Sequence, residues 1–554
     1  MEFSRRMFLG GSATVTAATV LGRAAPAAHA APAAPAATTT VPAWTRRPVS
    51  TQSGMVTGGQ ALLPGVAVYK GIPYGASTAG ANRWRPPRPA QRWDGVREAT
   101  SWGAACVQDT SGISASLIPP ISEDCLNLNV WTAAEAPDQG LPVLVWAYGG
   151  RDSAMWASQP LYDGSGLARK GLITVTFNRR IGPFGCLATP QLTAESEHDA
   201  SGNYVLMDVI AALEWVRENI RAFGGDPDRV TLGGWSAGAA CTWDLACSPL
   251  ASGLFHRALA ESGLEYTKDP ALNHLAGSYI TLPDAEAQGS ALMKTLGVTT
   301  LEQLRALPAR TIQNAGTSIG SYVLDGWVLR ETYTQILAAG AQNDVPFMAG
   351  NNKDENDGFM SSSTKPGSTL TLAQYKSDAE TEFGSLASDF LALYPANTDA
   401  AANDQNNLAS EDDERISTYL WGTQWIASGQ APAYTYFWTH TPPGEDTTNP
   451  VVPTTATGAY HGSEIYYIFD NLYGTARPWT AADYRIAETL SDYVVNFAAS
   501  GDPNGPGLPR WHALAPRRPE VMEVGDSFGT IDAASSGARY EFFANYLESQ
   551  PKEW

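Results

Sequence analysis

The sequence predicts an α/β fold in which a central, mostly parallel sheet is flanked by helices and carries large loop insertions. Short apolar runs that fit buried strands occur at 141–146, 172–177 and 229–235. The segment 204–223 lies between the second and third runs, has apolar residues at helical spacing and ends at two glycines. Another helical segment follows the third run. Strands that alternate with helices in this way are typical of a parallel sheet.

The first thirty residues are expected to be a signal peptide. Ser4-Arg5-Arg6-Met7-Phe8-Leu9 is a twin-arginine pattern, a weakly apolar stretch covers 10–21, and Ala28-His29-Ala30 fits a cleavage site. About a dozen apolar residues are too few to cross a bilayer, which takes roughly 20. Residues 31–45 are rich in Ala and Pro and predict a flexible leader. We therefore expect a secreted or otherwise extracytoplasmic protein with a single domain over 46–554.

Composition and charge restrict the partners. The chain has 554 residues, of which 44% are apolar and 17% are charged, an ordinary composition for a soluble protein. Its 36 Lys and Arg against 56 Asp and Glu give a formal net charge of −20, which repels nucleic acids and anionic membrane surfaces. We therefore expect a small-molecule substrate, no nucleic acid and no stable membrane anchoring. The sequence leaves the oligomeric state open.

The cysteines predict one disulfide and no metal site. Cys106 and Cys125 lie in loop-like sequence and would close a short loop, so we expect them to pair in an oxidising compartment. Cys186, Cys241 and Cys247 have apolar surroundings, and the last two fall on different faces of one helical segment. We expect these three to be buried thiols. No Cys/His cluster has metal-ligand spacing, and no cofactor is expected.

The segment Gly234-Trp235-Ser236-Ala237-Gly238 joins the apolar run at 229–235 to the following helical segment. Gly-x-Ser-x-Gly between a strand and a helix is the pattern of a nucleophile elbow in an α/β-hydrolase fold, which exposes the Ser hydroxyl at the top of the sheet. Only Gly tolerates the close backbone approach of so sharp a reversal. Ser236 is therefore the candidate nucleophile.

The same short pattern occurs twice more, and its context argues against both copies. Ser318 follows the polar stretch 311–315, which cannot supply a buried incoming strand, so we expect a loop there. Ser527 follows a strand-like run at 520–524, but no His lies downstream of it. The order of catalytic residues in an α/β-hydrolase is Ser, acid, His, which excludes Ser527.

The elbow is one of several motifs by which the chain resembles the type B carboxylesterases and cholinesterase-like lipases. The resemblance runs from about Val49 to Leu547. The resemblance rests on motifs that occur in the family's order and are together far more specific than any one alone. They are Lys70-Gly-Ile-Pro-Tyr74, Arg85-Pro-Pro87, Glu123-Asp-Cys-Leu-Asn-Leu-Asn-Val-Trp131, Gly182-Pro-Phe-Gly185, Gly202-Asn-Tyr204, Phe223-Gly-Gly-Asp-Pro227, Gly234-Trp-Ser-Ala-Gly238, Asp354-Glu355, His461-Gly-Ser-Glu-Ile465 and Gly501-Asp-Pro-Asn504. The resemblance implies an α/β-hydrolase fold and hydrolysis of carboxylic esters.

The resemblance also implies Glu355 as the acid and His461 as the general base of a catalytic triad. Glu355 follows a strand-like run at 345–349, and His461 stands in a Gly-flanked loop before the helical segment 463–472, so both fit residues on loops above a sheet. A Ser hydroxyl attacks well only when an imidazole takes its proton, and a carboxylate orients that imidazole. The remaining histidines beyond the signal peptide are expected to be solvated or structural: His198, His256, His274, His440 and His512.

Three positions around the nucleophile depart from the family. Its Gly-rich oxyanion motif reads Tyr148-Gly149-Gly150-Arg151 here, although Arg still supplies a backbone N–H. With Ala237, we expect the donors to be Gly150 and Arg151, and less surely Gly149. The family commonly has an acid directly before the nucleophile, and here that position is Trp235. The family's Asn-Tyr-Arg motif reads Asn178-Arg179-Arg180 in this chain. Because the family uses both positions for the pocket floor, Trp235 and Arg179 are candidate substrate-pocket residues. Arg151 is a third candidate, because its side chain could crowd the pocket.

Two interpretations of these departures stay open. In the first, the arginines make the pocket favour neutral or anionic esters over cationic ones. In the second, Arg179 stacks on Trp235 as a cation–π pair and Arg151 points to solvent.

Together the motifs predict an exported serine hydrolase that acts on carboxylic esters through an acyl-enzyme. An acyltransferase or cyclising enzyme on the same triad is one alternative, because a site that excludes water could admit another nucleophile. A non-catalytic cholinesterase-like binding protein is another, although Ser236, Glu355 and His461 are all present. The natural ester cannot be read from one sequence, because loops from distant segments build the pocket.

Overall fold

The computed structural model of the chain describes residues 40–111, 113, 115–150, 155–270, 279–316, 319–355, 370–445 and 458–551. The chain divides into residues 1–35 and residues 36–554. The expected signal peptide, most of the expected leader, Arg151, His274 and Ser318 all lie outside the described residues.

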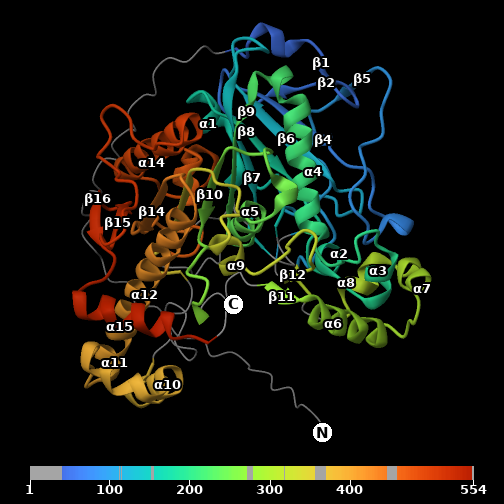
Figure 1. The fold of residues 1–554 in the computed structure, drawn as a ribbon. Coiled ribbons are helices and arrows are strands. Elements are labelled where there is room, and N and C mark those ends of the chain that lie inside the picture. Colours follow the sequence, from blue (N-terminus) through green and yellow to red (C-terminus); the bar gives the residue numbers. More distant parts are fainter. Residues whose placement is uncertain are drawn as a thin grey trace, which may run out of the picture. The chain divides into compact units, whose positions relative to one another are not determined.

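Among the described residues, eleven strands form one mixed sheet in the order β16-β15-β14-β13-β10-β9-β7-β8-β6-β4-β3 (Figure 1). From that edge to the other, these strands are β16 (Phe528–Asp532), β15 (Glu520–Val524), β14 (Ala433–Trp438), β13 (Phe347–Asn352), β10 (Arg257–Glu261), β9 (Gly225–Trp235), β7 (Leu141–Ala147), β8 (Ile173–Phe177), β6 (Asn127–Thr132), β4 (Ala67–Pro73) and β3 (Gly59–Gln60). The run from β15 to β8 is parallel throughout, and the outer pairs are antiparallel. The predicted mostly parallel sheet is therefore confirmed.

Helices and two small sheets complete the described chain. The helices are α1 (Ser165–Arg169), α2 (Gly182–Cys186), α3 (Pro190–Glu195), α4 (Tyr204–Asn219), α5 (Ala237–Ala246), α6 (Leu282–Thr295), α7 (Leu301–Ala306), α8 (Ala309–Gln313), α9 (Tyr333–Ala338), α10 (Leu372–Phe383), α11 (Ala387–Leu393), α12 (Asp399–Ser428), α13 (Ile465–Ile468), α14 (Ala481–Ser500) and α15 (Gly537–Glu548). One small sheet has the order β1 (Val49–Thr51), β2 (Gly54–Thr57), β5 (Val96–Glu98), and the other pairs β11 (Tyr279–Thr281) with β12 (Tyr322–Leu324).

Each face of the sheet carries its own apolar core. Successive side chains of a strand point to opposite faces, and in β7 Val143 and Val145 join one cluster while Leu144 and Trp146 join the other. The first cluster includes residues of α4, α5 and α12, and the second includes residues of α13 and α14. Strands buried on both faces explain the continuous apolar runs in the sequence.

The predicted elements differ from the structure mainly in their ends. The helix expected over 204–223 ends as α4 at Asn219 and continues as a single 3-10 turn, Ile220–Phe223. The helix expected over 463–472 is much shorter, because α13 covers only Ile465–Ile468. Asp470 follows it in the left-handed region at φ 48°, a backbone conformation that a helix cannot continue through.

The second Gly-x-Ser-x-Gly copy that the structure describes is not an elbow. Ser527 lies in the tight turn between β15 and β16, which pair antiparallel as a hairpin. A helix is needed after the Ser to build an elbow, and here a strand follows instead. Ser527 is therefore not at a strand-to-helix elbow.

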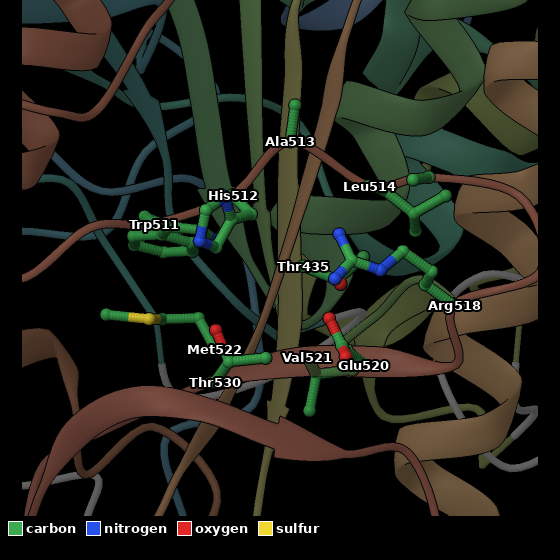
Figure 2. A pocket seen from close by; sticks show the side chains of 11 residues that line it. Thr435, Trp511, His512, Ala513, Leu514, Arg518, Glu520, Val521, Met522 and Thr530 are labelled. Atoms are coloured by element: carbon green, nitrogen blue, oxygen red, sulfur yellow. The ribbon is translucent and has the colours of Figure 1, made fainter.

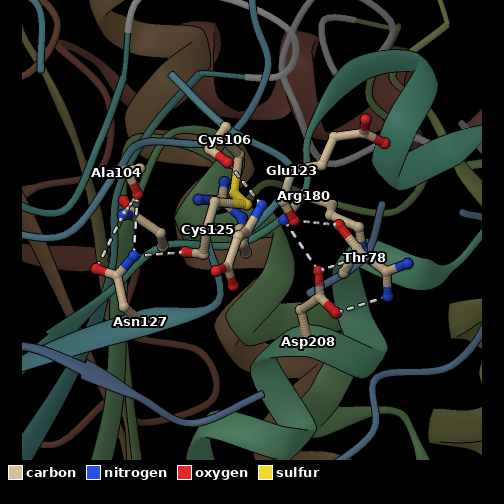
Figure 3. The surroundings of a disulfide bond; sticks show 12 residues. Thr78, Ala104, Cys106, Glu123, Cys125, Asn127, Arg180 and Asp208 are labelled. Atoms are coloured by element: carbon tan, nitrogen blue, oxygen red, sulfur yellow. Dashed lines mark hydrogen bonds and ion pairs between the residues drawn. A yellow bond between two sulfur atoms is a disulfide. The ribbon is translucent and has the colours of Figure 1, made fainter. Parts of the chain in front are cut away.

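The predicted disulfide is present between Cys106 and Cys125, whose Cα atoms are 5.0 Å apart (Figure 3). Beside it, the Asn127 Nδ2 donates hydrogen bonds of 2.9 Å to the carbonyl oxygens of Ala104 and Cys125. Cys186, Cys241 and Cys247 take no part in a disulfide and are buried, as predicted. Within the part of the chain that the structure describes, no helix combines the length and apolar character that crossing a membrane requires.

Candidate active site

Ser236 lies at the reversal between β9 and α5, in a backbone conformation of φ 54° and ψ −123°. A non-Gly residue rarely adopts a positive φ, and such strain concentrates at functional sites. The flanking glycines make the reversal possible. A Cβ on Gly238 would lie 2.0 Å from the carbonyl oxygen of Ala147, and one on Gly234 would lie 2.3 Å from that of Gly238. The elbow predicted from the sequence is therefore present.

Neighbouring strands hold Ser236 in place. Its backbone N–H donates to the carbonyl oxygen of Glu261, at the end of β10, at 2.8 Å. The loop after β7 approaches from the other side, because a Cβ on Gly149 would be 3.2 Å from the Ser236 Cβ and 2.6 Å from the Trp235 ring. The nucleophile candidate and the Tyr148–Gly150 loop, which is residues 148–150, are therefore adjacent at the carboxyl ends of parallel strands. Ligands bind at this edge in open α/β sheets.

Glu355 and His461 are hydrogen-bonded to each other, through the Glu355 Oε2 and the His461 Nδ1. Glu355 comes three residues after β13, and its Oε1 accepts the Asn352 backbone N–H at 2.6 Å. Burial lowers the pKa of His461, but the charge of Glu355 and the hydrogen bond to it outweigh burial and raise that pKa overall. The carboxylate thus fixes the ring and favours its protonated form.

The Trp235 ring connects the two halves of the site. It is 6% exposed and packs against the His461 ring with centroids 5.0 Å apart at an interplanar angle of 41°. A Cβ on Gly462 would lie 2.4 Å from the same indole. Because Trp235 directly precedes Ser236, this contact brings His461 and Glu355 beside the elbow. Residues more than a hundred positions apart in the sequence therefore meet at one edge of the sheet.

Two buried acids and a hydroxyl behind the site were not singled out in the sequence. Glu464 is 0% exposed, bonds to the Asn352 Nδ2, and accepts from the Ser262 hydroxyl at 3.4 Å. Burial and the nearby charge of Glu355 raise the pKa of Glu464 to about 7. Burial and the charge of Glu464 also hold the pKa of Glu261 well above its usual value. The His461-Gly-Ser-Glu motif could have pointed to Glu464 in the sequence. Glu261 could be identified only from the fold.

The structure describes three of the four candidate oxyanion donors. Gly150 adopts φ 83°, a left-handed conformation that suits Gly in particular. Burial raises the pKa of Tyr162, and an interaction with the Gly149 backbone opposes that rise. Ala237 begins α5 immediately after the nucleophile. Arg151 lies outside the described residues.

Arg179 does not stack on Trp235, the arrangement considered in the second interpretation. Its guanidinium carbon lies 4.3 Å from the centroid of the Tyr148 ring, and the side chain is fully buried at 1% exposure. Trp235 packs against His461 instead, with the two rings tilted. The sequence could not distinguish these partners, because both aromatic rings come from segments that only the sheet brings together.

No group of His, Cys, Asp and Glu among the described residues has the arrangement of a metal site. A cavity of about 20 Å³ opens beside β14 and β15, lined by Trp511, His512, Arg518 and Glu520 among others (Figure 2). That volume has room for about one water molecule, and none of the candidate site residues lines it.

Comparisons with known proteins agree with this geometry. The model of the carboxylesterase family matches residues 45–543. The chain belongs to the carboxylesterase family. It is 34% identical over 496 residues to fumonisin B1 esterase of Sphingopyxis macrogoltabida, covering 86% of each chain. It is 32% identical over 492 residues to para-nitrobenzyl esterase of Bacillus subtilis (strain 168), covering 84% of this chain and 93% of that one.

Solved structures give the same result for the fold. A PNB esterase structure superposes with a TM-score of 0.72 at 28% identity and covers 90% of this chain and 99% of its own. A carboxylesterase of Geobacillus stearothermophilus superposes with a TM-score of 0.70 at 28% identity, with the same coverage. The fold is that of an α/β-hydrolase, and the protein is a carboxylic ester hydrolase.

Proposed function

We propose that Ser236, His461 and Glu355 form a catalytic triad that hydrolyses carboxylic esters through an acyl-enzyme. The observation that carries the proposal is the hydrogen bond between His461 Nδ1 and Glu355 beside the strained elbow of Ser236. A Ser at a strained strand-to-helix elbow is typical of the nucleophile in an α/β-hydrolase, and an imidazole oriented by a carboxylate is what activates such a Ser.

The reaction then has two steps. The Nε2 of His461 takes the proton of the Ser236 hydroxyl as its oxygen attacks the ester carbonyl, and the imidazolium that forms is stabilised by Glu355. Collapse of the tetrahedral intermediate expels the alcohol, which receives the proton from His461. Water, activated by the same imidazole, hydrolyses the acyl-enzyme and restores the Ser236 hydroxyl.

Backbone amides stabilise the negative charge that develops on the carbonyl oxygen. The amides of Gly150 and Ala237 are the donors proposed among the described residues, with Arg151 completing the set as expected from the sequence. Each such donor is worth about 10² to 10³ in kcat.

The substrate is proposed to be a small-molecule ester that is neutral or anionic. Relatives carry the names fumonisin B1 esterase and para-nitrobenzyl esterase, so a para-nitrobenzyl ester is a suitable first assay. Trp235 stands where the family commonly has an acid, which removes the charge that would attract a cationic alcohol. Choline esters should therefore be poorer substrates than neutral esters of similar size, and efficient choline ester hydrolysis would contradict this.

Replacement of the triad residues tests the mechanism. Ser236→Ala or His461→Ala should lower kcat/KM by about 10⁴-fold or more, because neither the nucleophile nor the base has a substitute. Glu355→Ala should cost somewhat less. Ser527→Ala, which alters a Gly-x-Ser-x-Gly serine in a hairpin turn, is the matched control and should retain full activity. An organophosphate should label Ser236 alone, as located by mass spectrometry of peptides.

Retention of a tenth of wild-type turnover by Ser236→Ala would refute the triad. Transfer of the acyl group to an added alcohol in preference to water would favour the acyltransferase alternative instead. Absence of both hydrolysis and labelling in the wild-type protein would favour a binding function.

We also propose that the chain is exported through its twin-arginine signal. The disulfide between Cys106 and Cys125 is compatible with an oxidising compartment outside the cytoplasm. Changing Arg5 and Arg6 together to Lys should leave the precursor in the cytoplasm, because a receptor recognises the arginine pair and charge alone does not replace it. Secretion of this double variant at the wild-type level would show that another route is used.

A further inference from the structure

Arg179 is a buried cation without a carboxylate partner among the described residues. It follows β8 and is 1% exposed. Its neighbour Arg180 is equally buried but forms an ion pair with Asp208, with an Nη2–Oδ1 distance of 2.7 Å. The Nε and Nη1 of Arg179 have no hydrogen-bond partner within the described chain. An unpaired buried charge is costly, so its place in the fold requires an explanation.

The contacts of Arg179 on one side all go to the Tyr148–Gly150 loop. The guanidinium lies over the Tyr148 ring at 4.3 Å, and its Nη2 donates to the Gly150 carbonyl oxygen at 3.5 Å. The Tyr148 hydroxyl donates to the Arg179 carbonyl oxygen at 3.1 Å and lies 3.3 Å from the Arg179 backbone nitrogen. Side chain and backbone of one residue therefore hold both ends of this loop.

Cys241 lies in the middle of α5. Burial raises the pKa of its thiol, and the charge of Arg179 opposes that rise. The Tyr322 hydroxyl contacts the Cys241 sulfur at 3.1 Å and donates to the Ala237 carbonyl oxygen at 2.8 Å. Arg179 thus contacts the backbone segment that carries Gly150, and Tyr322 contacts the one that carries Ala237.

We propose that Arg179 is a positioning residue that fixes the Tyr148–Gly150 loop for oxyanion binding and adds a positive field beneath it. This inference rests on the proposed function. A guanidinium remains protonated even when buried, so its charge is present at every working pH. Its field acts in a low-dielectric interior and favours the negatively charged tetrahedral intermediate over the neutral ester. The effect should therefore appear in kcat and much less in KM.

Arg179→Met separates this role from simple packing. Met fills much of the same volume without the charge, and apolar replacements of buried ionic groups are often neutral or stabilising. The melting temperature should therefore hold or rise, while kcat falls by about 10- to 100-fold, somewhat less than the loss of a donor itself. Arg179→Lys keeps the charge but not the planar stacking on Tyr148, so it should recover part of the lost kcat.

The matched control is Arg83→Met. Arg83 is also a buried arginine, but it is paired with Glu123 and bonds to the Leu307 carbonyl oxygen at 2.5 Å, away from the elbow. This control should lower the melting temperature, because Glu123 loses its partner, and leave the kcat of the folded enzyme unchanged.

Two ketone inhibitors provide a second readout. A trifluoromethyl ketone forms a bond from its carbonyl carbon to the Ser236 oxygen, the proton passes to His461, and the carbonyl oxygen becomes an oxyanion. The corresponding methyl ketone stays trigonal. Arg179→Met should weaken binding of the trifluoromethyl ketone by the same factor by which it lowers kcat/KM. Binding of the methyl ketone should be unchanged. If Arg179→Met is poorly folded, the same comparison on Arg179→Lys decides.

Full kcat and full trifluoromethyl ketone affinity in a folded Arg179→Met variant would overturn the proposal. Equal losses for both ketones would overturn it too, because they would indicate a general distortion of the pocket. Failure of the triad is distinguishable, since wild-type enzyme would then not be labelled at Ser236, whereas failure of this inference leaves that labelling intact.

Discussion

The disulfide between Cys106 and Cys125 gives a prediction whose size follows from the chain. The two cysteines are 19 residues apart, and removing a cross-link of that loop length costs about 3 kcal/mol in the chain-entropy model. Unfolding residues 36–554 at about 2.1 cal/mol/K per residue has an entropy of roughly 1.1 kcal/mol/K. The free-energy cost divided by this entropy gives the expected shift: Cys106→Ala/Cys125→Ala should lower the melting temperature by about 3 °C.

Calorimetry at one fixed scan rate, on wild-type and doubly substituted protein, measures this shift. Dithiothreitol should lower the melting temperature of the wild type toward that of the variant and leave the variant unchanged. Activity at 25 °C should stay mostly intact, because Gln108 holds this loop to Met155 through two hydrogen bonds of 2.7 Å that need no disulfide. An unchanged melting temperature, or free thiols at both positions in exported protein, would refute the reasoning.

Two further predictions concern buried charge. Asp208→Asn should cost about 3 to 5 kcal/mol in unfolding free energy, because it leaves the Arg180 guanidinium buried without its partner, and urea denaturation should reveal a lower midpoint at an unchanged slope. Burial lowers the pKa of His440, but hydrogen bonds to Asp483 and Asp526 raise it overall, so its protonated form stabilises the fold. That stabilisation is complete below the unfolded pKa of about 6.5 and is lost as pH rises through the higher folded pKa. His440→Gln should therefore lower the melting temperature at pH 6 and change it little at pH 9; equal losses at both would contradict the prediction.

The local elements and the nucleophile candidate could be predicted from the sequence. Gly234 and Gly238 predicted the elbow, because a sharp strand-to-helix reversal brings backbone close to backbone and leaves no room for a side chain at either position. The continuous apolar runs predicted a buried parallel sheet, because strands covered on both faces have no polar side. The pairing of Cys106 with Cys125 was also predictable, since the loop between them is short.

The contacts between side chains of distant segments could not be predicted from the sequence. The sequence indicated Arg179 and Trp235 as candidate pocket residues and left a contact between them open. In the structure Arg179 packs on Tyr148 and Trp235 packs on His461. The buried Glu261 behind the elbow likewise became visible only when β10 was placed beside β9. Sequence periodicity gives the face of an element on which a residue lies, whereas its partner depends on strand order and on the loops that cross the sheet edge. The charge environment of the nucleophile is therefore a property of the assembled sheet.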